Sequence, residues 1–519
     1  MMGMEVFCNL FLFSFSIMFL VCAWRVVNWA WIRPKTLEKW LRGQDLKGNP
    51  YRLFYGDTKE IAKMMNETKS KPMNVLSDEV VPRVIPYFFE SIQKHGKNSF
   101  VWLGTIPMVI ITDPDHVKEV LSKHNTFQQN LADPVVYKLS QGLLKYEGDK
   151  WSKHRKIANP AFQLEKLKHM VPAMYKICSE MVGRWEEIVS RNESGELDVW
   201  PELKTIAVNV ISLTAFGISY ETGRRLFELQ HELAEHASEL RHSVYIPGGR
   251  FLPTKKNRRM NGIDKEINTV LKRIIEKRIG AMKEGEEASN NLLDMLLESN
   301  FKEMKHHGNQ EFGMSIEDII SECKLFYLAG QETTSDLLVW TMILLSRNQE
   351  WQELAREEVM HVFGDDKPDF DGLNRLKIVT MILNESLRLY PPVPTLIRIV
   401  KEDAKLGNLS LPAGVRLLVP IIFLHHDPEM WGEDANEFNP ERFREGVSKA
   451  TNGKACYLPF SGGPRICIGL NFAMVEAKTA LSCILRRFSF KLSPSYAHAP
   501  YTGLTTNPLY GAPLILQKL

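Results

Sequence analysis

The strongest constraint on this chain is a cysteine motif near its C-terminal end. The segment reads F-x-x-G-x-R-x-C-x-G, and its specified positions are Phe460, Gly463, Arg465, Cys467 and Gly469. Five specified residues at ~5% background each coincide by chance about once in 10⁶ to 10⁷ windows. A lone cysteine is ordinarily a small buried hydrophobe. This spacing instead predicts a thiolate that the protein holds as the axial ligand of a haem iron.

Each position of the motif has an expected role around the metal. We expect Gly463 and Gly469 to let the backbone turn closely around the sulfur, with their N–H groups pointing at it. Arg465 is expected to neutralise a haem propionate, and Phe460 is expected to cover the proximal face of the metal. An anionic sulfur ligand favours O–O cleavage, so the motif indicates oxygen chemistry.

A second motif, Ala-Gly330-Gln-Glu332-Thr333-Thr, lies in an apolar helix predicted over about 319–345. Glycine inside a helix costs about 1 kcal/mol relative to alanine, so a functional reason is expected. The missing side chain of Gly330 is predicted to let a diatomic molecule approach the helix. Glu332 and Thr333 are then predicted to deliver protons to bound oxygen. The alternative is a buried helix with a polar stretch, and the Cys467 motif favours the proton-delivery interpretation.

Haem carries two propionates, which need cations. Trp151 and Arg155 lie four residues apart on a predicted helix, so both point to one side. Arg398 is an isolated charge in an apolar segment. Each of these residues alone is more often a surface group. Together with Arg465 they form the predicted set of propionate anchors.

A third motif predicts architecture and not chemistry. Glu385 and Arg388 are three residues apart in apolar surroundings, and Arg442 follows in a Pro-Glu-Arg-Phe segment. Many such pairs are solvated surface pairs worth little. The apolar surroundings favour a buried charge triad, in which a guanidinium holds the carboxylate bidentately.

The N-terminal segment from Val6 to Trp24 carries no charge. At 1.5 Å per residue it would span about 28 Å, close to the thickness of a bilayer core. A cleaved signal peptide is the competing interpretation, but Glu5 stands where a basic region is usual. Cations follow the segment, which predicts a retained single-pass anchor with the rest of the chain in the cytosol, and the endoplasmic reticulum is the expected membrane. The predicted division is an anchor and interface segment over 1–32 and a catalytic domain over 33–519.

Composition is that of a globular protein with a large core. The chain is 44% hydrophobic and 24% charged, and its net charge of +3 indicates no nucleic-acid partner. Its seven cysteines show no zinc spacing, which favours a reducing compartment. The fold is predicted to be mainly α with small β-sheets. Strands are expected at 100–103, 108–112 and 488–492, a helix at 263–282, and a solvated connection at 285–313.

Together these motifs resemble the cytochrome P-450 superfamily, over the whole chain after the anchor. Segments such as Trp31-Ile-Arg-Pro34-Lys and His425-His-Asp-Pro428 are similar to the plant microsomal branch that includes secologanin synthase and triterpenoid oxidases. The resemblance implies the cytochrome P-450 fold, haem b held by Cys467 and a haem-thiolate monooxygenase. Gly462 departs from the tryptophan usual in this branch, which is expected to loosen the proximal loop or alter reductase docking.

The implied reaction is hydroxylation or further oxidation of C–H bonds in a bulky hydrophobic substrate, a plant triterpenoid or secoiridoid. No G-x-G-x-x-G follows a strand, so electrons are expected from NADPH through a separate reductase. Its docking face is predicted at Lys150, Lys153, Lys156, Arg486 and Arg487, unless these are scattered solvated cations. Alternatives are a gibberellin or steroid hydroxylase, a reductase-independent hydroperoxide isomerase, and a non-catalytic haem protein. Expected substrate contacts are 128–144, 226–251, the helix before Glu332, 393–397 and 502–507.

Overall fold

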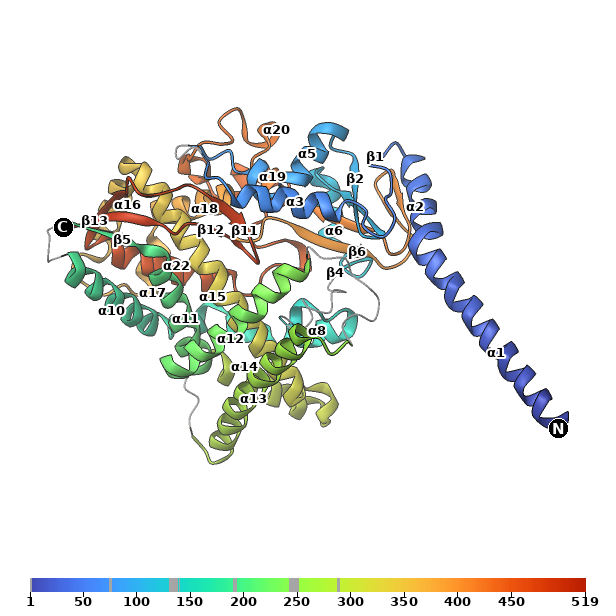
Figure 1. Ribbon diagram of the computed structural model, residues 1–519. Helices are drawn as coiled ribbons and strands as arrows, with labels where there is room; N and C mark the ends of the chain where they lie inside the picture. The colour runs from blue at the N-terminus through green and yellow to red at the C-terminus, as the bar shows by residue number, and fades with distance from the viewer. Residues whose placement is uncertain are drawn as a thin grey trace.

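The computed structural model describes residues 2–73, 77–129, 139, 141–189, 194–241, 252–286 and 290–519. A long N-terminal helix projects away from a body in which helices dominate, and the largest sheet lies on the side of the body nearest that helix (Figure 1). The prediction of a mainly α fold with small β-sheets is confirmed.

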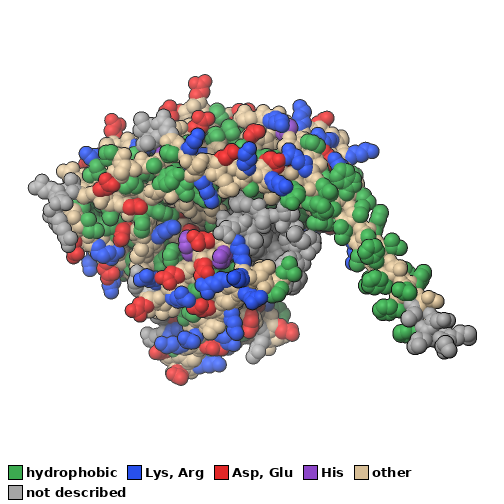
Figure 2. Space-filling view, viewed as in Figure 1, with side chains coloured by type: hydrophobic (Ala, Val, Ile, Leu, Met, Phe, Trp, Pro, Cys, Tyr) green, Lys and Arg blue, Asp and Glu red, His purple; other side chains and the backbone are tan. Residues whose placement is uncertain are grey.

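The N-terminal helix is apolar on all sides. Helix α1 (Met2–Val27) continues through a π-helical turn, η1 (Asn28–Ile32), into α2 (Arg33–Arg42). The stretch Asn9–Arg42 is long and apolar enough to cross a membrane, and the large hydrophobic side chains of α1 are exposed (Figure 2). At its base the Tyr51 hydroxyl donates to the Ala30 carbonyl at 2.6 Å. The predicted boundary between residues 32 and 33 falls inside a continuous helical run and stays a prediction.

The largest sheet has six strands in the order β1-β2-β3-β9-β6-β4. Its strands are β1 (Lys47–Gly48), β2 (Ser99–Leu103), β3 (Ile106–Ile110), β4 (Phe127–Gln129), β6 (Leu396–Val400) and β9 (Arg416–Val419). Two of these match the strands predicted at 100–103 and 108–112. The Asp113 carboxylate then accepts hydrogen bonds from the Asp115 and His116 N–H groups and begins α6 (Pro114–Ser122).

Three smaller sheets complete the β structure. Strand β10 (Phe488–Leu492), predicted from its alternating pattern, pairs with β13 (Pro513–Lys518), which also pairs with β5 (Ser194–Asp198). Strands β7 (Ala404–Leu406) and β8 (Leu409–Leu411) form a hairpin. Strands β11 (Pro500–Thr502) and β12 (Thr506–Pro508) form another, in which Thr502 pairs with Thr506. Residues 503–505 therefore form the turn of that hairpin.

The helical body is built around α15 (Ile316–Arg347), which is buried over most of its length. The Ser315 hydroxyl and the Asp318 carboxylate cap its first turn reciprocally. The helices that surround it in the larger half of the body are α8 (Gly148–Ala158), α9 (Leu164–Lys168), α10 (Val171–Val189), α11 (Val199–Phe216), α12 (Tyr220–Arg241), α13 (Lys255–Lys283), α16 (Gln349–Phe363), α17 (Phe370–Arg375), α18 (Ile378–Leu389) and α22 (Leu470–Leu485).

Shorter helices cover the sheet and the long C-terminal connection. They are α3 (Thr58–Lys69), α4 (Val81–Val84), α5 (Pro86–His95), α19 (Ile421–His425), α20 (Pro428–Trp431), α21 (Val447–Ala450) and the 3₁₀ turns η2 (Gly142–Leu144), η3 (Asn159–Phe162), η5 (Gln310–Phe312), η6 (Pro440–Phe443) and η7 (Gly463–Arg465). The predicted helix at 263–282 lies within α13.

The prediction of a solvated connection at 285–313 is wrong for most of that range. The structure has a helix there, α14 (Leu292–His307), whose first turns bury Leu292, Leu293 and Leu296 in the main core. Asn291 caps it by accepting from the Asp294 N–H at 2.8 Å. The prediction weighed the charges and the Asn and Gly residues, whereas tertiary burial of a short leucine-rich face decided the structure.

Candidate active site

The Cys467 loop runs from η7 into α22 and holds the sulfur by its backbone. The Cys467 N–H donates to the Phe460 carbonyl at 2.9 Å, which fixes the loop behind the thiol. The Cys467 side chain is exposed, yet burial within the body raises the pKa of its thiol. The thiol is therefore accessible, although most of its surroundings are protein. The Gly469 N–H and the Arg155 guanidinium act in the opposite direction and favour the thiolate.

The two glycines of this loop differ in how they match the expectation: the Gly469 N–H hydrogen-bonds to the Cys467 thiol as expected, whereas Gly463 makes its close approach elsewhere. Gly463 has φ +65°, and a Cβ there would lie 2.4 Å from the Leu121 carbonyl oxygen of α6. Its close approach is to that helix and not to the sulfur. A Cβ on Gly469 would meet only the Cys467 Sγ, at an ordinary 3.9 Å. Gly462 has extended backbone, so its conformation does not require glycine, but a Cβ there would lie 3.3 Å from the Leu121 side chain and 3.4 Å from that of Leu458.

Three of the predicted propionate anchors form one cluster beside the loop. The Arg465 guanidinium lies 4.5 Å from the Trp151 ring centre and is ion-paired with Glu147. Arg155, one turn after Trp151 on α8, lies close enough to interact electrostatically with both Arg465 and Cys467. Burial lowers the pKa of Arg155 and of Arg465. The cluster is therefore a desolvated concentration of positive charge next to the thiol.

Arg398 joins this cluster from strand β6 of the sheet. It is 3% exposed, and its Nη1 donates to the Ile397 carbonyl at 3.0 Å. Its buried Nε has no hydrogen-bond partner among the described residues. Burial, with a smaller contribution from Arg465, lowers the pKa of Arg398 to about 10. A buried guanidinium with an unused donor fits the carboxylate of a bound anion, so the residues present fit a haem and its propionates.

The predicted oxygen-handling residues lie in the middle of α15. Although this helix is mainly buried, Ala329 is exposed and Thr333 is half-buried, so this part of the helix borders a hollow. The Thr333 hydroxyl donates to the Ala329 carbonyl at 2.8 Å. Glu332 is buried and has His231 of α12 as its neighbour, with Nδ1 and Oε1 3.9 Å apart. The hydroxyl and the acid thus lie on adjacent faces of one turn.

The explanation predicted for Gly330 is wrong in its steric part. A Cβ on Gly330 would lie 2.8 Å from the Ile211 side chain of α11. The glycine therefore permits the close packing of α11 against α15, which is a helix–helix requirement that sequence alone does not reveal. The small side chain at the hollow is that of Ala329.

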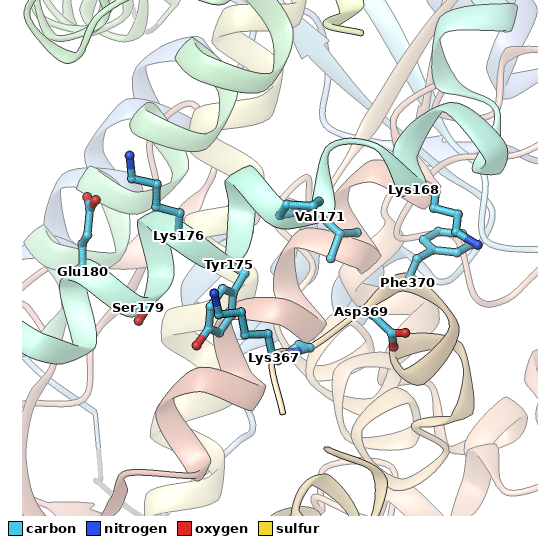
Figure 3. A pocket seen from close by; sticks show the side chains of 11 residues that line it. Lys168, Val171, Tyr175, Lys176, Ser179, Glu180, Lys367, Asp369 and Phe370 are labelled. Carbon is cyan, nitrogen blue, oxygen red and sulfur yellow. The ribbon is translucent and has the colours of Figure 1, made fainter. Parts of the chain in front are cut away.

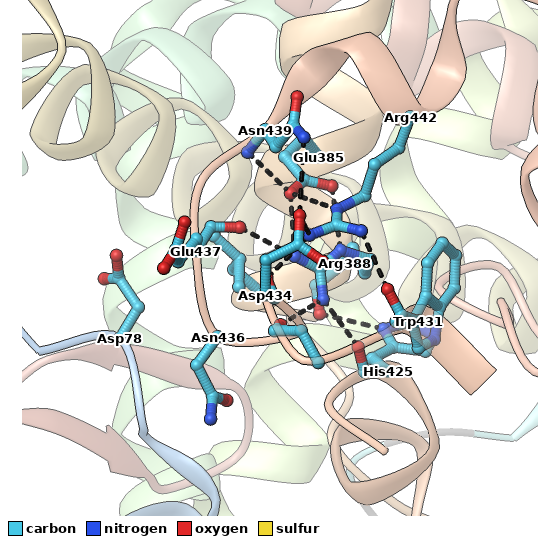
Figure 4. Close-up of polar contacts among 12 residues, drawn as sticks. Asp78, Glu385, Arg388, His425, Trp431, Asp434, Asn436, Glu437, Asn439 and Arg442 are labelled. Atoms are coloured by element: carbon cyan, nitrogen blue, oxygen red, sulfur yellow. Dashed lines mark hydrogen bonds and ion pairs between the residues drawn. The ribbon is translucent and has the colours of Figure 1, made fainter. Parts of the chain in front are cut away.

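The predicted triad is brought together in the structure (Figure 4). Glu385 and Arg388 are fully buried and form a bidentate pair with N–O distances of 2.8 and 2.7 Å. The remaining Arg388 donors reach the carbonyls of His425, Ala435 and Glu437 at 2.6 to 3.0 Å. Arg442 lies 3.5 Å from Glu385. A stronger contact joins Arg442 to Asp434 at 2.5 Å.

Comparison with known proteins agrees with this arrangement. The family model for cytochrome P450 matches residues 83–508, which include every predicted site residue. This chain belongs to the cytochrome P450 family. Cytochrome P450 CYP72A219 of Panax ginseng is 58% identical to this P450 over 98% of each chain. Cytochrome P450 72A397 of Kalopanax septemlobus is 55% identical, over 96% of this P450 and 95% of the relative.

A third relative, 7-deoxyloganic acid hydroxylase of Catharanthus roseus, is 53% identical over 96% of each chain. These relatives and the family match establish that this P450 is a haem-iron monooxygenase of the plant type. The predictions of the family and of the enzyme class are confirmed.

The sequence interpretation missed two acids of this P450. Glu147 accepts hydrogen bonds from Arg465 and from the Gln129 N–H, so it partly neutralises the basic cluster. Asp336 lies one turn after Glu332 on α15 and is fully buried. A charged residue four positions after Glu332 in an apolar helix was the available signal for Asp336. Glu147 had none, because its partner is 318 residues away in the chain.

A surface pocket of about 730 Å³ lies away from these residues (Figure 3). Its walls come from the start of α10 and from residues 367–370, and they include Lys168, Tyr175 and Lys367. Neither Cys467 nor Thr333 lines it. We assign it no part in the oxidation chemistry.

Proposed function

We propose that this P450 is a membrane-anchored haem-thiolate monooxygenase that hydroxylates or further oxidises a C–H bond of a bulky hydrophobic terpenoid. It uses O2 and electrons that NADPH supplies through a separate reductase. The observation that carries the proposal is that the Cys467 thiol lies beside Arg155. Arg155 in turn interacts with Arg465, and Arg465 interacts with Arg398, so the thiol lies next to a cluster of buried cations. A haem-thiolate site needs one anionic sulfur for the iron and cations for the two propionates.

In this proposal Cys467 is the iron ligand, and haem bound there supplies the activation of O2. The Gly469 N–H and the Arg155 guanidinium stabilise the thiolate form of Cys467 against the cost of burial. Trp151, Arg155, Arg398 and Arg465 would hold the propionates. Phe460 would pack against the bound group, and its carbonyl fixes the Cys467 backbone.

Binding of propionates would change the partners of the basic cluster. Arg465 is paired with Glu147, and burial raises the pKa of Glu147, against the opposing effects of the Gln129 N–H and of Arg465. A propionate would add negative charge beside this carboxyl and favour its protonation. The unused Nε of Arg398 is the donor that supports direct contact with a propionate most strongly.

Proton delivery is assigned to Thr333 and Glu332. The Thr333 hydroxyl borders the hollow, donates to the Ala329 carbonyl and can accept a hydrogen bond from water or an acid. In a relay it would release its own proton towards the reacting atoms as it receives one from that partner. Glu332 is the adjacent acid. His231 of α12 lies next to Glu332 and is partly exposed, so it links Glu332 to the exposed face of α12 and can pass protons between them. A relay of this kind keeps protons available where a buried oxygen species needs them.

Glu385, Arg388 and Arg442 are assigned a purely architectural role. Every nitrogen of the Arg388 guanidinium donates to the carboxylate of Glu385 or to a backbone carbonyl of the segment 425–437. The Tyr457 hydroxyl further ties the segment before the cysteine loop to the Asn384 carbonyl at 2.9 Å. The triad therefore supports the polypeptide that leads to Cys467.

The proposed location is the endoplasmic reticulum membrane, crossed once by α1, with the catalytic domain in the cytosol. Cations follow the apolar stretch at Arg25 and Arg33, and none precedes it, which supports this orientation. Three of the five predicted reductase-docking cations are paired with acidic side chains of this chain, which leaves fewer unpaired positive charges for a partner than expected. Lys150 is paired with Asp318 at 2.7 Å, Lys156 with Glu303, and Arg487 with Glu186 at 3.8 Å.

The proposed substrate is a plant terpenoid, either a triterpenoid or a secoiridoid. Support comes from the relative named 7-deoxyloganic acid hydroxylase and from the mainly apolar expected contact segment at 393–397, whereas the expected segment 502–507 is mostly polar but uncharged. The expected segments 128–144 and 226–251 fall partly outside the described residues. Apart from residues 139 and 141, their described parts lie in β4, η2 and α12.

The test is reconstitution of the full-length enzyme with a plant P450 reductase, NADPH and ¹⁸O2. The panel contains 7-deoxyloganic acid and pentacyclic triterpene acids, with a gibberellin precursor and a sterol as competing classes. A product carrying one ¹⁸O atom, formed only with reductase, supports the proposal. Turnover of a fatty-acid hydroperoxide without reductase would overturn it in favour of an isomerase. Cys467→Ser is the matched control and should lose the thiolate-type spectrum of the reduced carbon monoxide complex.

A further inference from the structure

Glu322 is a fully buried acid of α15 that the proposed mechanism leaves unused. Both of its carboxylate oxygens are bonded. Oε1 accepts from the His154 Nδ1–H at 2.7 Å, and Oε2 accepts from the Leu143 N–H at 3.0 Å. His154, on α8, is fully buried as well. A buried carboxylate is costly unless such partners satisfy it, so these bonds hold α15, α8 and the turn η2 in one arrangement.

The turn η2 is shaped to receive this carboxylate. Gly142 has φ +62°, and a Cβ there would lie 2.5 Å from the Glu322 Oε2. A side chain at this position would therefore displace the acid, and the positive φ favours glycine on its own account. The Lys145 and Tyr146 N–H groups both donate to the Gly142 carbonyl at 2.9 Å, which closes the backbone into a tight turn.

A second acid of α15 holds the other end of this turn. Asp318, one helical turn before Glu322, accepts from the Tyr146 hydroxyl at 3.1 Å. It is also ion-paired with Lys150 of α8 at 2.7 Å. The segment 142–147 is thus attached to α15 twice, once through its backbone and once through a side chain.

The same segment orients the Arg465 guanidinium of the cysteine loop. Nη2 donates to the Tyr146 carbonyl at 2.9 Å, and Nη1 donates to the Leu143 carbonyl at 3.4 Å. Nη2 is also paired with Glu147. The Arg465 Nε is buried and has no hydrogen-bond partner in the described part of the chain. The segment therefore uses the two Nη groups, and Nε is the donor that remains for a ligand.

We propose that Glu322 is a positioning residue for haem binding. Through the Leu143 N–H it fixes the backbone that orients Arg465, and so keeps the Arg465 Nε available to a propionate. This inference rests on the proposed function, because it takes Arg465 as a propionate anchor. Glu322 acts through the intervening backbone and not by contact with the ligand.

Four variants of the full-length holoenzyme test this path. Glu322→Leu removes both acceptor oxygens with little change in size, whereas Glu322→Gln keeps an oxygen that can accept from the Leu143 N–H. Arg465→Lys keeps the positive charge but loses the planar guanidinium. The matched control is Asn300→Ala. Asn300 of α14 is buried and accepts from the Met314 N–H at 2.6 Å, and it has no hydrogen bond to the segment 142–147 among the described residues.

The first measurement is the rate of haem transfer from each variant to excess apomyoglobin. Glu322→Leu should release haem about tenfold faster than the wild type, as expected for the loss of one anchoring hydrogen bond. Glu322→Gln should restore the rate to within about threefold, and Asn300→Ala should stay within about twofold. Equal acceleration in Glu322→Leu and Asn300→Ala would reduce the role of Glu322 to general stability and contradict the proposal.

The second measurement repeats the comparison in the Arg465→Lys background. Because Glu322 is proposed to act through the guanidinium, Glu322→Leu should change the haem transfer rate less than about twofold there. The same tenfold change in both backgrounds would show a path that bypasses Arg465 and would overturn the proposal.

The third measurement is backbone hydrogen exchange over residues 141–147. Glu322→Leu should raise exchange in this segment about tenfold, with Asn300→Ala within about twofold of the wild type. Faster haem release with unchanged exchange would refute the proposed link through the backbone.

Gly142→Ala takes the place of Glu322→Leu if that variant does not fold. Its Cβ would displace the Glu322 carboxylate while both bonding partners stay in the chain. The same rise in haem transfer is expected, and it should again be lost in the Arg465→Lys background; a rise of equal size in both backgrounds would count against the proposal. None of these measurements requires turnover, so failure of the proposed reaction is recognised separately in the product assay.

Discussion

Two sets of buried charges in this P450 differ in how completely they are satisfied. At the Glu385–Arg388 pair, each nitrogen of the Arg388 guanidinium has a partner, and the carboxylate of Glu385 also accepts from the Asn439 N–H at 2.9 Å. On α15, Asp336 has no hydrogen-bond partner among the described residues, and Glu332 has only the distant His231. Both sets are buried, so the difference does not come from exposure.

The difference separates groups that hold the fold from groups that act in the site. A fully bonded ion pair in a low-dielectric interior stabilises one arrangement of the backbone and is costly to break. A buried acid with unused hydrogen-bonding capacity reduces stability, and such groups are concentrated at functional sites. The following predictions test this division, from the largest expected effect to the smallest.

Arg388→Ala should have the largest effect. It leaves Glu385 buried without its main partner, and breaking a buried pair in this way costs about 3–5 kcal/mol of unfolding free energy. Chemical unfolding followed by circular dichroism measures the loss, and the haem content of the purified variant reports the cysteine loop. A change below about 1 kcal/mol would show that the cluster is not the support we describe.

The same cluster should make the fold sensitive to acid. His425 and His426 are buried beside Arg388, and burial lowers the pKa of His425 to about 3 and that of His426 to about 4. Unfolded histidines take up protons below about pH 6.5 while the folded ones do not, so stability falls as pH falls from about 6.5 towards 4. For His426 the full effect is about 3 kcal/mol.

The measurement is the unfolding free energy at pH 7, 6 and 5. His426→Gln should reduce the slope by about one proton, or ~1.4 kcal/mol per pH unit. An unchanged slope in this variant would assign the acid sensitivity to other groups. Burial raises the pKa of Asp336 instead, so its expected pH trend is opposite, which makes the two regions distinguishable in one data set.

Thr333→Ala should separate function from stability. Among the described residues the Thr333 hydroxyl bonds only to the Ala329 carbonyl of its own helix, so the unfolding free energy should change by less than about 0.5 kcal/mol. Peroxide formed per NADPH should nevertheless rise several-fold, because the hydroxyl no longer delivers protons. Full coupling of NADPH to product in this variant would exclude Thr333 from the relay. Thr334→Ala, at the next position, is the control.

Arg224→Ala should have the smallest effect. Arg224 pairs with Glu228 on the surface of α12 at 3.1 Å, and both side chains are about half exposed. Pairs of this kind contribute about 0–1 kcal/mol and are screened by salt. Melting curves at low and high salt measure the contribution. If Arg224→Ala lost as much stability as Arg388→Ala, burial could not explain why the Arg388 pair matters more.

The sequence predicted most accurately where chemistry needs fixed residue types at fixed spacing. The cysteine motif, the Glu332–Thr333 pair and the Glu385–Arg388 pair are all local in sequence, and the structure places each group as one unit. Strand β10 and the cap at Asp113 were predictable for the same reason. The errors concerned contacts between distant segments. The roles of Gly330 and Gly463 depend on Ile211 and Leu121, and α14 depends on the core that covers it.

The sequence by itself determined the family, the thiol that is proposed to bind haem and the apolar N-terminal helix, because each depends on residues that are close together in the chain. Only the tertiary structure decided that Glu147 pairs with Arg465, that Arg398 enters the same basic cluster from a sheet, and that Glu322 binds the Leu143 N–H. Burial and electrostatic interactions depend on distance in space, and elements far apart in the chain set those distances only after they pack together.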